Sequence, residues 1–484
     1  MPQGCFIGID QGSSSTKALV VSTEGQIVFQ ARKNLQPPFR EGLRIEQDPL
    51  EILRSVQEAL NESALSVSSS GFAVLGIGLA CQRSSCLIWN GSTGEPLSPI
   101  ISWRDTRGTD LVNSLSEKAS HIFETTGLPL TPYYSASKFR WLKDNIPAAK
   151  QSQAVFGTLS SFLVQRLTGG SQAVIDQTNA ARTQLMNIHS LEWDPELMKL
   201  FGLSGITLPE ITPTAHAFGT VRLSGGTAPL LACIGDQQSA MLGLGVTEKG
   251  NGGINYGTGG FLMVNTGNAL TPAKGLMASI QYSTEKERFY LLEGSVNAVG
   301  EALEWLRARL GLFKEYSEVD DLCWKALTDV VVFIGLNGTG APHWEAGISS
   351  SIHGLTIESA AADIVRGTIE GIAFFMKDIA EIIRSAGIEP SSFAFSGGLA
   401  SISYLAQVQC DLLRKNAVMS SEQEVSALGA ALLAGLQHGT WTSTDIKKLT
   451  SQGETVNGEA NPGAERRYKR WKELHRMTKE LDRI

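Results

Sequence analysis

The stretch FIGIDQGSSSTKALVVS, residues 6–22, decides the fold that we expect for this chain. An apolar run ends in Asp10, a polar turn rich in glycine and serine follows, and a second apolar run begins at Ala18. β-Branched and apolar residues on both sides of such a turn predict a β-hairpin. The turn offers main-chain N–H groups, hydroxyls and one ammonium, which suit a phosphate chain, and Asp10 could hold the accompanying metal ion. An ordinary surface hairpin is the alternative interpretation of these residues alone.

A second copy of this hairpin is predicted about 240 residues further along the chain. Residues 253–265 read GINYGTGGFLMVN, with an apolar segment on each side of Gly257-Thr258-Gly259-Gly260. A unit that recurs within one chain indicates a duplicated architecture. Two such hairpins could clamp one nucleotide from two sides, as in the actin-like ATPases. The chain contains neither a P-loop nor a G-x-G-x-x-G motif, so those two nucleotide-binding routes have no direct support.

Composition excludes several classes of protein. The chain has 484 residues, 42% hydrophobic and 18% charged, which predicts a globular protein of two or three domains. A net charge of −7 and a pI of about 5.7 argue against binding to nucleic acid, and no apolar run is long enough to span a membrane. The six cysteines lack C-x-x-C spacing, so no zinc or redox motif is indicated. Without a secretory leader, we expect a cytoplasmic protein with reduced thiols.

A polar, glycine-rich segment at residues 248–253 is the expected boundary between two lobes. We therefore predict an N-terminal lobe over residues 1–249, which carries the acceptor site and the first hairpin. A C-terminal, nucleotide-binding lobe is predicted over residues 250–440, followed by a charged tail and helix over residues 441–484.

Three helices are predicted in the C-terminal half. Apolar residues spaced by three and four over 358–386 predict a core helix that ends at Gly387. The small residues of 425–437 predict a helix that packs closely against its neighbours. The last segment, ERRYKRWKELHRMTKELDRI, predicts a charged amphipathic helix, which we expect to be solvated rather than to bind nucleic acid.

A carboxylate is predicted at the end of a strand. Residues 230–234 read as a strand that runs into Gly235 and Asp236, and a helix is expected directly afterwards. In α/β folds, ligands collect at the carboxyl ends of strands and at helix N-termini. Asp236 is therefore a candidate functional residue.

Several long motifs resemble those of the FGGY carbohydrate kinases, above all the members that phosphorylate glycerol. They are GIDQGSSSTKA in the first hairpin, QRxxxxxW from Gln82, TNAARTQLMNIHSLEWD from Thr178, GDQQSAMLG from Gly235, NYGTGGF from Asn255 and GAPHW from Gly340. The resemblance covers residues 6–439. It implies an α/β fold of two actin-like (ribonuclease H-like) lobes around a central cleft for ATP and substrate. It also implies the transfer of phosphate from ATP, with Mg²⁺, to a hydroxyl of a sugar or polyol, often by a dimer or tetramer.

The resemblance also implies residue roles. Asp236 would be the general base, and Asp10 and Asp236 would hold Mg²⁺. The nucleotide would contact Gly12, Ser13, Ser14, Lys17, Gly257, Thr258, Gly259, Gly300, Glu304, Gly397 and Gly398, whereas Ile402 replaces an expected asparagine. The acceptor would contact Arg83, Ser84, Trp103, Tyr133, Asp236, Gln237 and Phe261. A separate chemical argument supports Asp236, because an alcohol must lose its proton as it attacks phosphorus and a nearby carboxylate can accept it.

Two departures from the family pattern concern substrate and regulation. Ser84 stands where the members that phosphorylate glycerol have a glutamate, and the W-x-D-x-R spacing from Trp103 resembles that of ketose and polyol kinases. We therefore predict a substrate other than glycerol, with glycerol as the alternative. Ala228 stands where members inhibited by fructose 1,6-bisphosphate have an arginine, so we expect no such inhibition. An actin-like nucleotide switch or sugar sensor without phosphoryl transfer, and an inactive pseudo-kinase, are the remaining alternatives.

Overall fold

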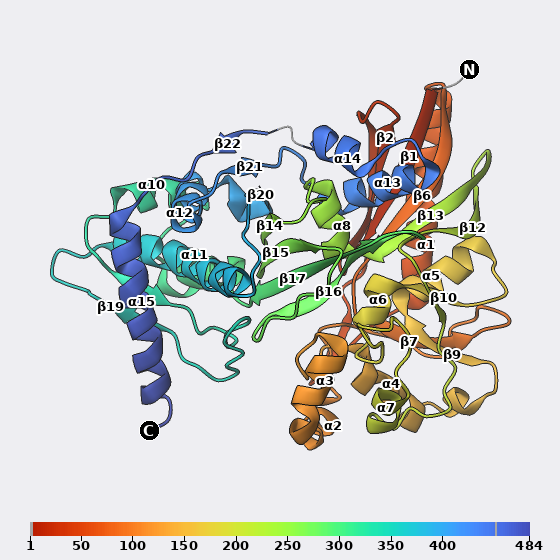
Figure 1. Cartoon of the computed structure of the whole chain (residues 1–484), viewed down its shortest axis with the longest axis horizontal. Helices are drawn as coiled ribbons and strands as arrows, with labels where there is room; N and C mark the ends of the chain where they lie inside the picture. The colour runs from red at the N-terminus through yellow and green to blue at the C-terminus, as the bar shows by residue number, and fades with distance from the viewer. Residues whose placement is uncertain (1–2, 451–452) are drawn as a thin grey trace.

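The computed structural model describes residues 3–450 and 453–484 and contains two large mixed sheets (Figure 1). The first sheet has the strand order β12-β13-β6-β1-β2-β3. β1–β2–β3 is an antiparallel meander, and β6 and β13 run parallel to β1. The predicted first hairpin is thereby confirmed. The strands are β1 (Gln3–Gln11), β2 (Ser15–Ser22), β3 (Ile27–Asn34), β6 (Phe72–Cys81), β12 (Ala215–Leu223) and β13 (Gly226–Gly235).

The second sheet repeats this arrangement. Its order is β16-β17-β15-β14-β20-β21-β22, in which β14, β15 and β17 are antiparallel and β20 and β21 run parallel to β14. The predicted second hairpin and the duplication are both confirmed. The strands are β14 (Asn251–Tyr256), β15 (Gly260–Gly267), β16 (Met277–Ser283), β17 (Arg288–Val296), β20 (Ser392–Ser396), β21 (Ala417–Met419) and β22 (Thr455–Val456).

A third, five-stranded sheet lies between β3 and β12 in sequence, interrupted by β6, and supports the loops that carry the predicted acceptor residues. Its order is β4 (Phe39–Glu41), β5 (Arg44–Gln47), β8 (Ile100–Ile101), β7 (Cys86–Asn90) and β9 (Ala154–Thr158). Two small pairs complete the sheets, β10 (Val174–Asp176) with β11 (Glu210–Thr212) and β18 (Val331–Phe333) with β19 (Ser351–His353).

Helices cover these sheets. They are α1 (Pro49–Ser69), α2 (Thr109–Ser114), α3 (Ala119–Thr126), α4 (Ser135–Asn145), α5 (Leu159–Thr168), α6 (Gln177–Ala181), α7 (Pro195–Leu200), α8 (Asp236–Gly243), α9 (Gly300–Trp305), α10 (Glu318–Lys325), α11 (Ala361–Ser385), α12 (Ser403–Leu413), α13 (Val425–His438), α14 (Ser443–Thr450) and α15 (Pro462–Leu481). Short turns of helix lie at η1 (Ser116–Lys118), η2 (Pro147–Lys150), η3 (Leu306–Leu310) and η4 (Gly398–Ser401). None of the helices in the described ranges is long and apolar enough to cross a membrane.

The predicted core helix is α11. Its apolar stripe is fully buried, and Gly387 follows the helix with a positive φ of 83°, as expected of a residue that ends a helix. The stripe consists of Val365, Ile369, Ile372, Met376, Ile379 and Ile383. The six cysteines are also buried and unpaired.

α13 packs on the first sheet although it follows strands β14 to β21 of the second sheet in sequence (Figure 1). Glycines make this contact possible, because a Cβ at Gly78 or Gly8 would lie 1.9 Å from a main-chain oxygen of α13. The expected close packing of this helix is therefore confirmed. The division of the chain at residue 249 stays a prediction, and α13 is a segment from beyond it that completes the core of the first sheet.

We expect the replacement Gly78→Ala to destabilise the fold strongly. The added methyl group would meet the carbonyl oxygen of Ala430, and neither the strand nor the helix backbone can move without disturbing its neighbours. The free energy of unfolding should fall by about 3 kcal/mol, measured by urea denaturation. Gly226→Ala is the matched control, because a Cβ at Gly226 in the same sheet meets nothing within 4 Å. Equal midpoints for the two variants would contradict the role of this close contact.

α15 differs from the expected solvated helix. Trp471 is fully buried, Tyr468 nearly so, and Arg467 makes two hydrogen bonds of 2.6 Å to the buried carboxylate of Glu370 on α11. The apolar residues of α15 recur every three positions among many charged residues and form one face of the helix. This face packs into the core of the second half of the chain, which the charged composition of the segment did not indicate. The charges of the opposite face remain exposed.

Candidate active site

Asp236 lies where the sequence pattern predicted, at the junction of β13 and α8. Its Oδ1 accepts a hydrogen bond of 2.8 Å from the main-chain N–H of Gln237 and lies 3.3 Å from Nε of Arg83. Burial raises the pKa of Asp236, while Arg83 opposes that rise by favouring the charged form. A partly buried carboxylate with a raised pKa is a better proton acceptor than an exposed one.

The carboxylate of Glu293 fixes the position of the Arg83 side chain. The guanidinium donates to both oxygens of this carboxylate, at 2.9 and 3.0 Å, and Arg182 makes a further close ion pair with Glu293. Burial alone would raise the pKa of Glu293, but the two arginines outweigh it and hold the pKa at about 2. Because Arg83 follows β6 and Glu293 lies in β17, this cluster joins the two large sheets beside Asp236.

Sequence analysis did not single out Glu293 or Arg182 as site residues. A signal existed for Glu293, because this carboxylate directly follows the apolar residues Leu291 and Leu292 within β17. A charge in a buried strand needs a partner, so the pattern could have predicted an ion pair. It could not have identified the partners, since Arg83 and Arg182 are distant in sequence.

Trp103 and Tyr133 are brought together by a buried lysine. Nζ of Lys138 donates to the main-chain oxygen of Tyr133 at 2.6 Å and to that of Trp103 at 3.2 Å. Burial lowers the pKa of Lys138 to about 8. The Tyr133 side chain is 49% exposed, which leaves its ring free to contact a ligand.

The remaining predicted acceptor residues differ in their availability. The carboxamide oxygen of Gln237 is buried and has no hydrogen-bond partner among the described residues, so a ligand hydroxyl could pair with it only after the side chains that cover it shift. Phe261 on β15 packs against an apolar cluster that includes Ala240 and Met241 of α8. The hydroxyl of Ser84 is buried and donates to the main-chain oxygen of Arg182 at 3.2 Å.

The first hairpin places Asp10 opposite Lys17 in the β1–β2 pair. Burial, with the nearby charge of Asp236, raises the pKa of Asp10 to about 7, although Lys17 opposes the rise. Two mutually repelling carboxylates fit a divalent cation, which prefers oxygen ligands. No group of three or more possible metal ligands occurs in the described ranges, so Mg²⁺ here would take its other ligands from phosphate and water.

The turn of the first hairpin is closed by a hydrogen bond of 3.0 Å from the Gly12 N–H to the Ser15 oxygen. The side chain of Ser14 is exposed. Lys17 is already paired, with its Nζ 2.5 Å from the carboxylate of Glu424 just before α13. If Lys17 contacts a phosphate, as predicted, it would have to share or exchange this partner.

Main-chain contacts bring most of the predicted residues of the second hairpin together. The Gly300 N–H donates to the oxygens of Gly257 and Thr258, both at 3.0 Å, and Gly259 lies against the main chain after β17. Gly397 has a positive φ of 92° and lies where a Cβ would meet the Tyr256 oxygen at 2.5 Å. Gly398 begins η4 directly afterwards. Glu304 is more remote, and its carboxylate is occupied by Arg307 and Tyr316.

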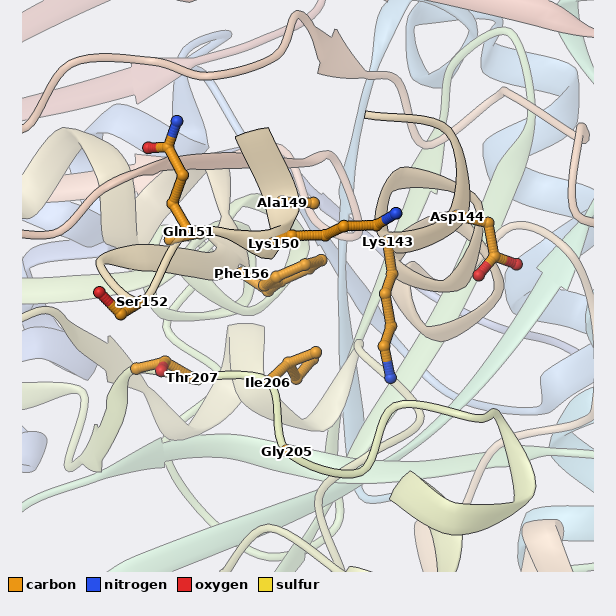
Figure 2. A pocket seen from close by; sticks show the side chains of 11 residues that line it. Lys143, Asp144, Ala149, Lys150, Gln151, Ser152, Phe156, Gly205, Ile206 and Thr207 are labelled. Carbon is orange, nitrogen blue, oxygen red and sulfur yellow. The ribbon is translucent and has the colours of Figure 1, made fainter. Parts of the chain in front are cut away.

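A separate surface pocket of about 450 Å³ lies beside α4 and β9 (Figure 2). Its lining includes Lys143, Lys150, Phe156 and Ile206 but none of the predicted site residues. Nζ of Lys143 is used by the main-chain oxygens of Gly202 and Ser204. The candidate active site is therefore assigned by the chemistry around Asp236 and not by the size of this hollow.

Comparison with known proteins agrees with this geometry. The model of the N-terminal domain of the FGGY family of carbohydrate kinases matches residues 5–243, and that of the C-terminal domain matches residues 252–438. The chain belongs to the FGGY family of carbohydrate kinases. As a member, it has the two-domain actin-like, ribonuclease H-like fold and is a phosphotransferase that acts on an alcohol group.

The relatives of this FGGY kinase include glycerol kinases. The glycerol kinase of Shewanella sp. (strain ANA-3) is 35% identical over 460 residues, which cover 92% of this chain and 93% of the relative. That of Enterococcus casseliflavus is 33% identical over 483 residues, or 96% and 95% of the two chains. The crystal structure of Plasmodium falciparum glycerol kinase with ADP has a TM-score of 0.92 at 31% identity and covers 99% of this chain and 98% of its own. A xylulose kinase from Rhodospirillum rubrum, with a TM-score of 0.90 and 99% of each chain covered, is only 20% identical and shows the fold alone.

Proposed function

We propose that this FGGY kinase transfers the γ-phosphate of ATP to a hydroxyl of a small sugar or polyol, with Asp236 as the general base. The observation that carries the proposal is the partly buried Asp236 carboxylate, which is held by Arg83 and lies within the electrostatic reach of Asp10. Asp236 would accept the hydroxyl proton, while Arg83 and the unpaired oxygen of Gln237 orient the acceptor. Exclusion of water during lobe closure would limit wasteful hydrolysis of ATP.

Asp10 and Asp236 are the residues proposed to hold Mg²⁺. When bound, the ion would neutralise charge on the phosphates and help to align them. The main-chain N–H groups of the two hairpin turns would hold the phosphate chain, together with Ser14, Lys17 and Thr258. Gly300, Glu304, Gly397 and Gly398 would contact the rest of the nucleotide.

We expect the Mg²⁺ requirement to depend on pH through Asp10. Because its pKa is raised to about 7, a proton competes for the carboxylate below that pH, and each unit of fall should raise the Mg²⁺ concentration for half-maximal activity up to about tenfold. Between pH 8 and 9 the requirement should be constant. Titrations of activity with free Mg²⁺, corrected for the protonation of ATP, test this expectation. A requirement that stays equal from pH 6 to pH 8 would contradict it.

The same group links pH to the stability of the metal-free protein. The pKa of Asp10 is higher in the folded state than its ordinary value of 3.8, so its favourable contribution is complete below about pH 4. That contribution should be lost as the pH rises through about 7, where the folded state must ionise a buried carboxyl group.

We propose that the substrate is a sugar or polyol other than glycerol. Ser84 supports this, because it supplies no charged acceptor and its hydroxyl is already bound to the Arg182 oxygen. Glycerol is the second candidate, favoured by the glycerol kinases among the relatives. The test compares kcat/KM for glycerol with that for four- to seven-carbon polyols and ketoses. A wide preference for glycerol would reject the first candidate, and the absence of phosphorylation of any acceptor would reject the proposed function.

Kinase activity is favoured over the three alternative functions, and the location, assembly and regulation of the protein are proposed with it. A nucleotide switch, a sugar sensor or an inactive pseudo-kinase would have no use for a proton acceptor beside Arg83, so kinase activity is favoured. We propose a cytoplasmic location, where ATP is available and thiols stay reduced, a homodimer or homotetramer, and no membrane or nucleic-acid partner. Ala228, at the start of the region that pairs β13 with β12, supports the absence of inhibition by fructose 1,6-bisphosphate.

A further inference from the structure

Gln82, in the loop after β6, is at the centre of a closed ring of hydrogen bonds. Its carboxamide oxygen accepts from the hydroxyls of Ser13, at 3.2 Å, and of Ser85, at 3.1 Å. Each of these hydroxyls accepts in turn from Trp103. The Ser85 hydroxyl binds the main-chain N–H of Trp103 at 3.0 Å, and the Ser13 hydroxyl binds its indole N–H at 3.2 Å. The orientation of the tryptophan is thus fixed at two points by one carboxamide oxygen.

The carboxamide nitrogen and the main-chain N–H of Gln82 bind to the first hairpin and its surroundings. Its Nε2 donates to the side-chain oxygens of Gln11, at 3.2 Å, and of Gln47, at 3.3 Å. Gln47 donates to the main-chain oxygen of Ser13 at 3.0 Å, and the Gln82 N–H donates to the main-chain oxygen of Gln11 at 3.0 Å. The turn that carries the predicted phosphate contacts is therefore bound to Gln82 through both its side chain and its main chain.

This network leaves no spare bonding capacity in the Gln82 carboxamide. The side chain is 2% exposed, and its oxygen accepts two hydrogen bonds while its nitrogen donates two. Buried and fully satisfied networks of this kind are rigid, and removal of one member leaves several polar groups unpaired. The Ser13 hydroxyl already donates to Gln82 and accepts from Trp103. A nucleotide would therefore contact the main chain of Ser13 and not its side chain.

We propose that Gln82 is a positioning residue that couples the acceptor site to the phosphate hairpin, by holding Trp103 and Ser13 on the same oxygen. The inference rests on the proposed function, in which Trp103 contacts the acceptor and the Ser13 turn contacts ATP. Because the link is rigid, an acceptor that displaces the indole ring also displaces the Ser13 hydroxyl, and a nucleotide that displaces the turn also displaces the ring. By linkage, each ligand then raises the affinity for the other by the same factor.

The test is the replacement Gln82→Met, which preserves side-chain length and removes every side-chain hydrogen bond of Gln82. In the wild-type enzyme, saturating acceptor should lower the Kd of a non-hydrolysable ATP analogue about fivefold. In the variant this factor should fall to about one, and the acceptor KM should rise about tenfold. The Kd of the analogue measured without acceptor should change by less than about twofold.

Gln165→Met is the matched control. Gln165 is a buried glutamine that accepts from the indole N–H of Trp89 at 2.6 Å and donates to two main-chain oxygens, away from the candidate active site. Its loss should lower stability but change neither the acceptor KM nor the coupling factor. If both variants shift the KM equally, or if Gln82→Met retains the wild-type coupling factor, the proposal is wrong.

A double-mutant cycle gives an independent measurement if Gln82→Met does not fold. Ser13→Ala removes the bridging hydroxyl, and Trp103→Phe keeps an aromatic ring but removes the indole N–H. Because both break the same bond, their effects on the coupling factor should be strongly non-additive, whereas additive effects would reject a direct link.

Hydrogen exchange separates failure of this inference from failure of the proposed function. In the free protein, the amides of residues 12–15 should exchange faster in Ser13→Ala than in wild type, whether or not any acceptor is phosphorylated. Unchanged exchange would overturn the positioning role, even in an active kinase. Altered exchange in a protein that phosphorylates nothing would uphold the structural link and reject only the kinase proposal.

Discussion

Replacement of Asp236 by asparagine should lower kcat by about two to four orders of magnitude, because general-base catalysis contributes a factor of this size. Asparagine has nearly the same shape but cannot accept the hydroxyl proton. The junction of β13 and α8 should remain intact, since the amide oxygen can still accept from the Gln237 N–H. Loss of one negative charge beside Asp10 should also lower the pKa of Asp10, which adds to the change through the metal site.

The measurement is single-turnover phosphoryl transfer together with the Kd of an ATP analogue. We expect the Kd to change by no more than about threefold, so that the defect is in the chemical step. Asp321→Asn is a suitable control, because this carboxylate on α10 is 79% exposed and lies 3.5 Å from Nζ of Lys325. Turnover close to that of the wild type in Asp236→Asn would remove the assigned base and with it the proposed mechanism.

Elements that depend on residues close together in sequence were predicted, whereas contacts between distant segments were not. The hairpin at Asp10, the strand that ends at Asp236 and the core helix α11 were predicted because each depends on residues that are neighbours in sequence. The repeat of the hairpin correctly indicated two sheets of the same topology. The position of α13 against β1 and β6 could not be predicted in the same way, because its glycine contacts join segments about 350 to 420 residues apart.

The positions of the predicted site residues also depend on contacts with residues that are distant in sequence. The resemblance supplied Arg83, Trp103 and Tyr133 as acceptor residues, but it gave no reason for their positions. The structure supplies that reason in Lys138 and Glu293, each of which binds groups that are remote in sequence or belong to different loops. For Ser84 the structure adds a partner that the sequence did not indicate, the main-chain oxygen of Arg182, and its contact with an acceptor stays a prediction.

Replacement of Glu293 by glutamine should damage both stability and acceptor use. The carboxylate balances Arg83 and Arg182 in a buried site, so loss of its charge leaves two guanidinium groups without an adequate counter-ion. We expect the free energy of unfolding to fall by about 3 kcal/mol, toward the low end of the range for such changes, because the amide retains part of the hydrogen bonding. Arg83 should also turn toward Asp236, its nearest remaining carboxylate at 3.3 Å, which would lower the basicity of Asp236.

Glu370→Gln separates these two effects. Glu370 is equally buried and accepts two hydrogen bonds of 2.6 Å from Arg467, but these join α11 to α15 and do not involve Asp236. Both variants should unfold at lower urea concentration, whereas only Glu293→Gln should lower kcat/KM for the acceptor, by about tenfold or more. Because the pKa of Glu293 is held at about 2, the wild-type ion pair is complete at every pH used for the assay, and the difference should not vary between pH 6 and pH 8. If the two variants lose kcat/KM equally, the loss reflects general destabilisation, and Glu293 has no specific part in positioning Arg83.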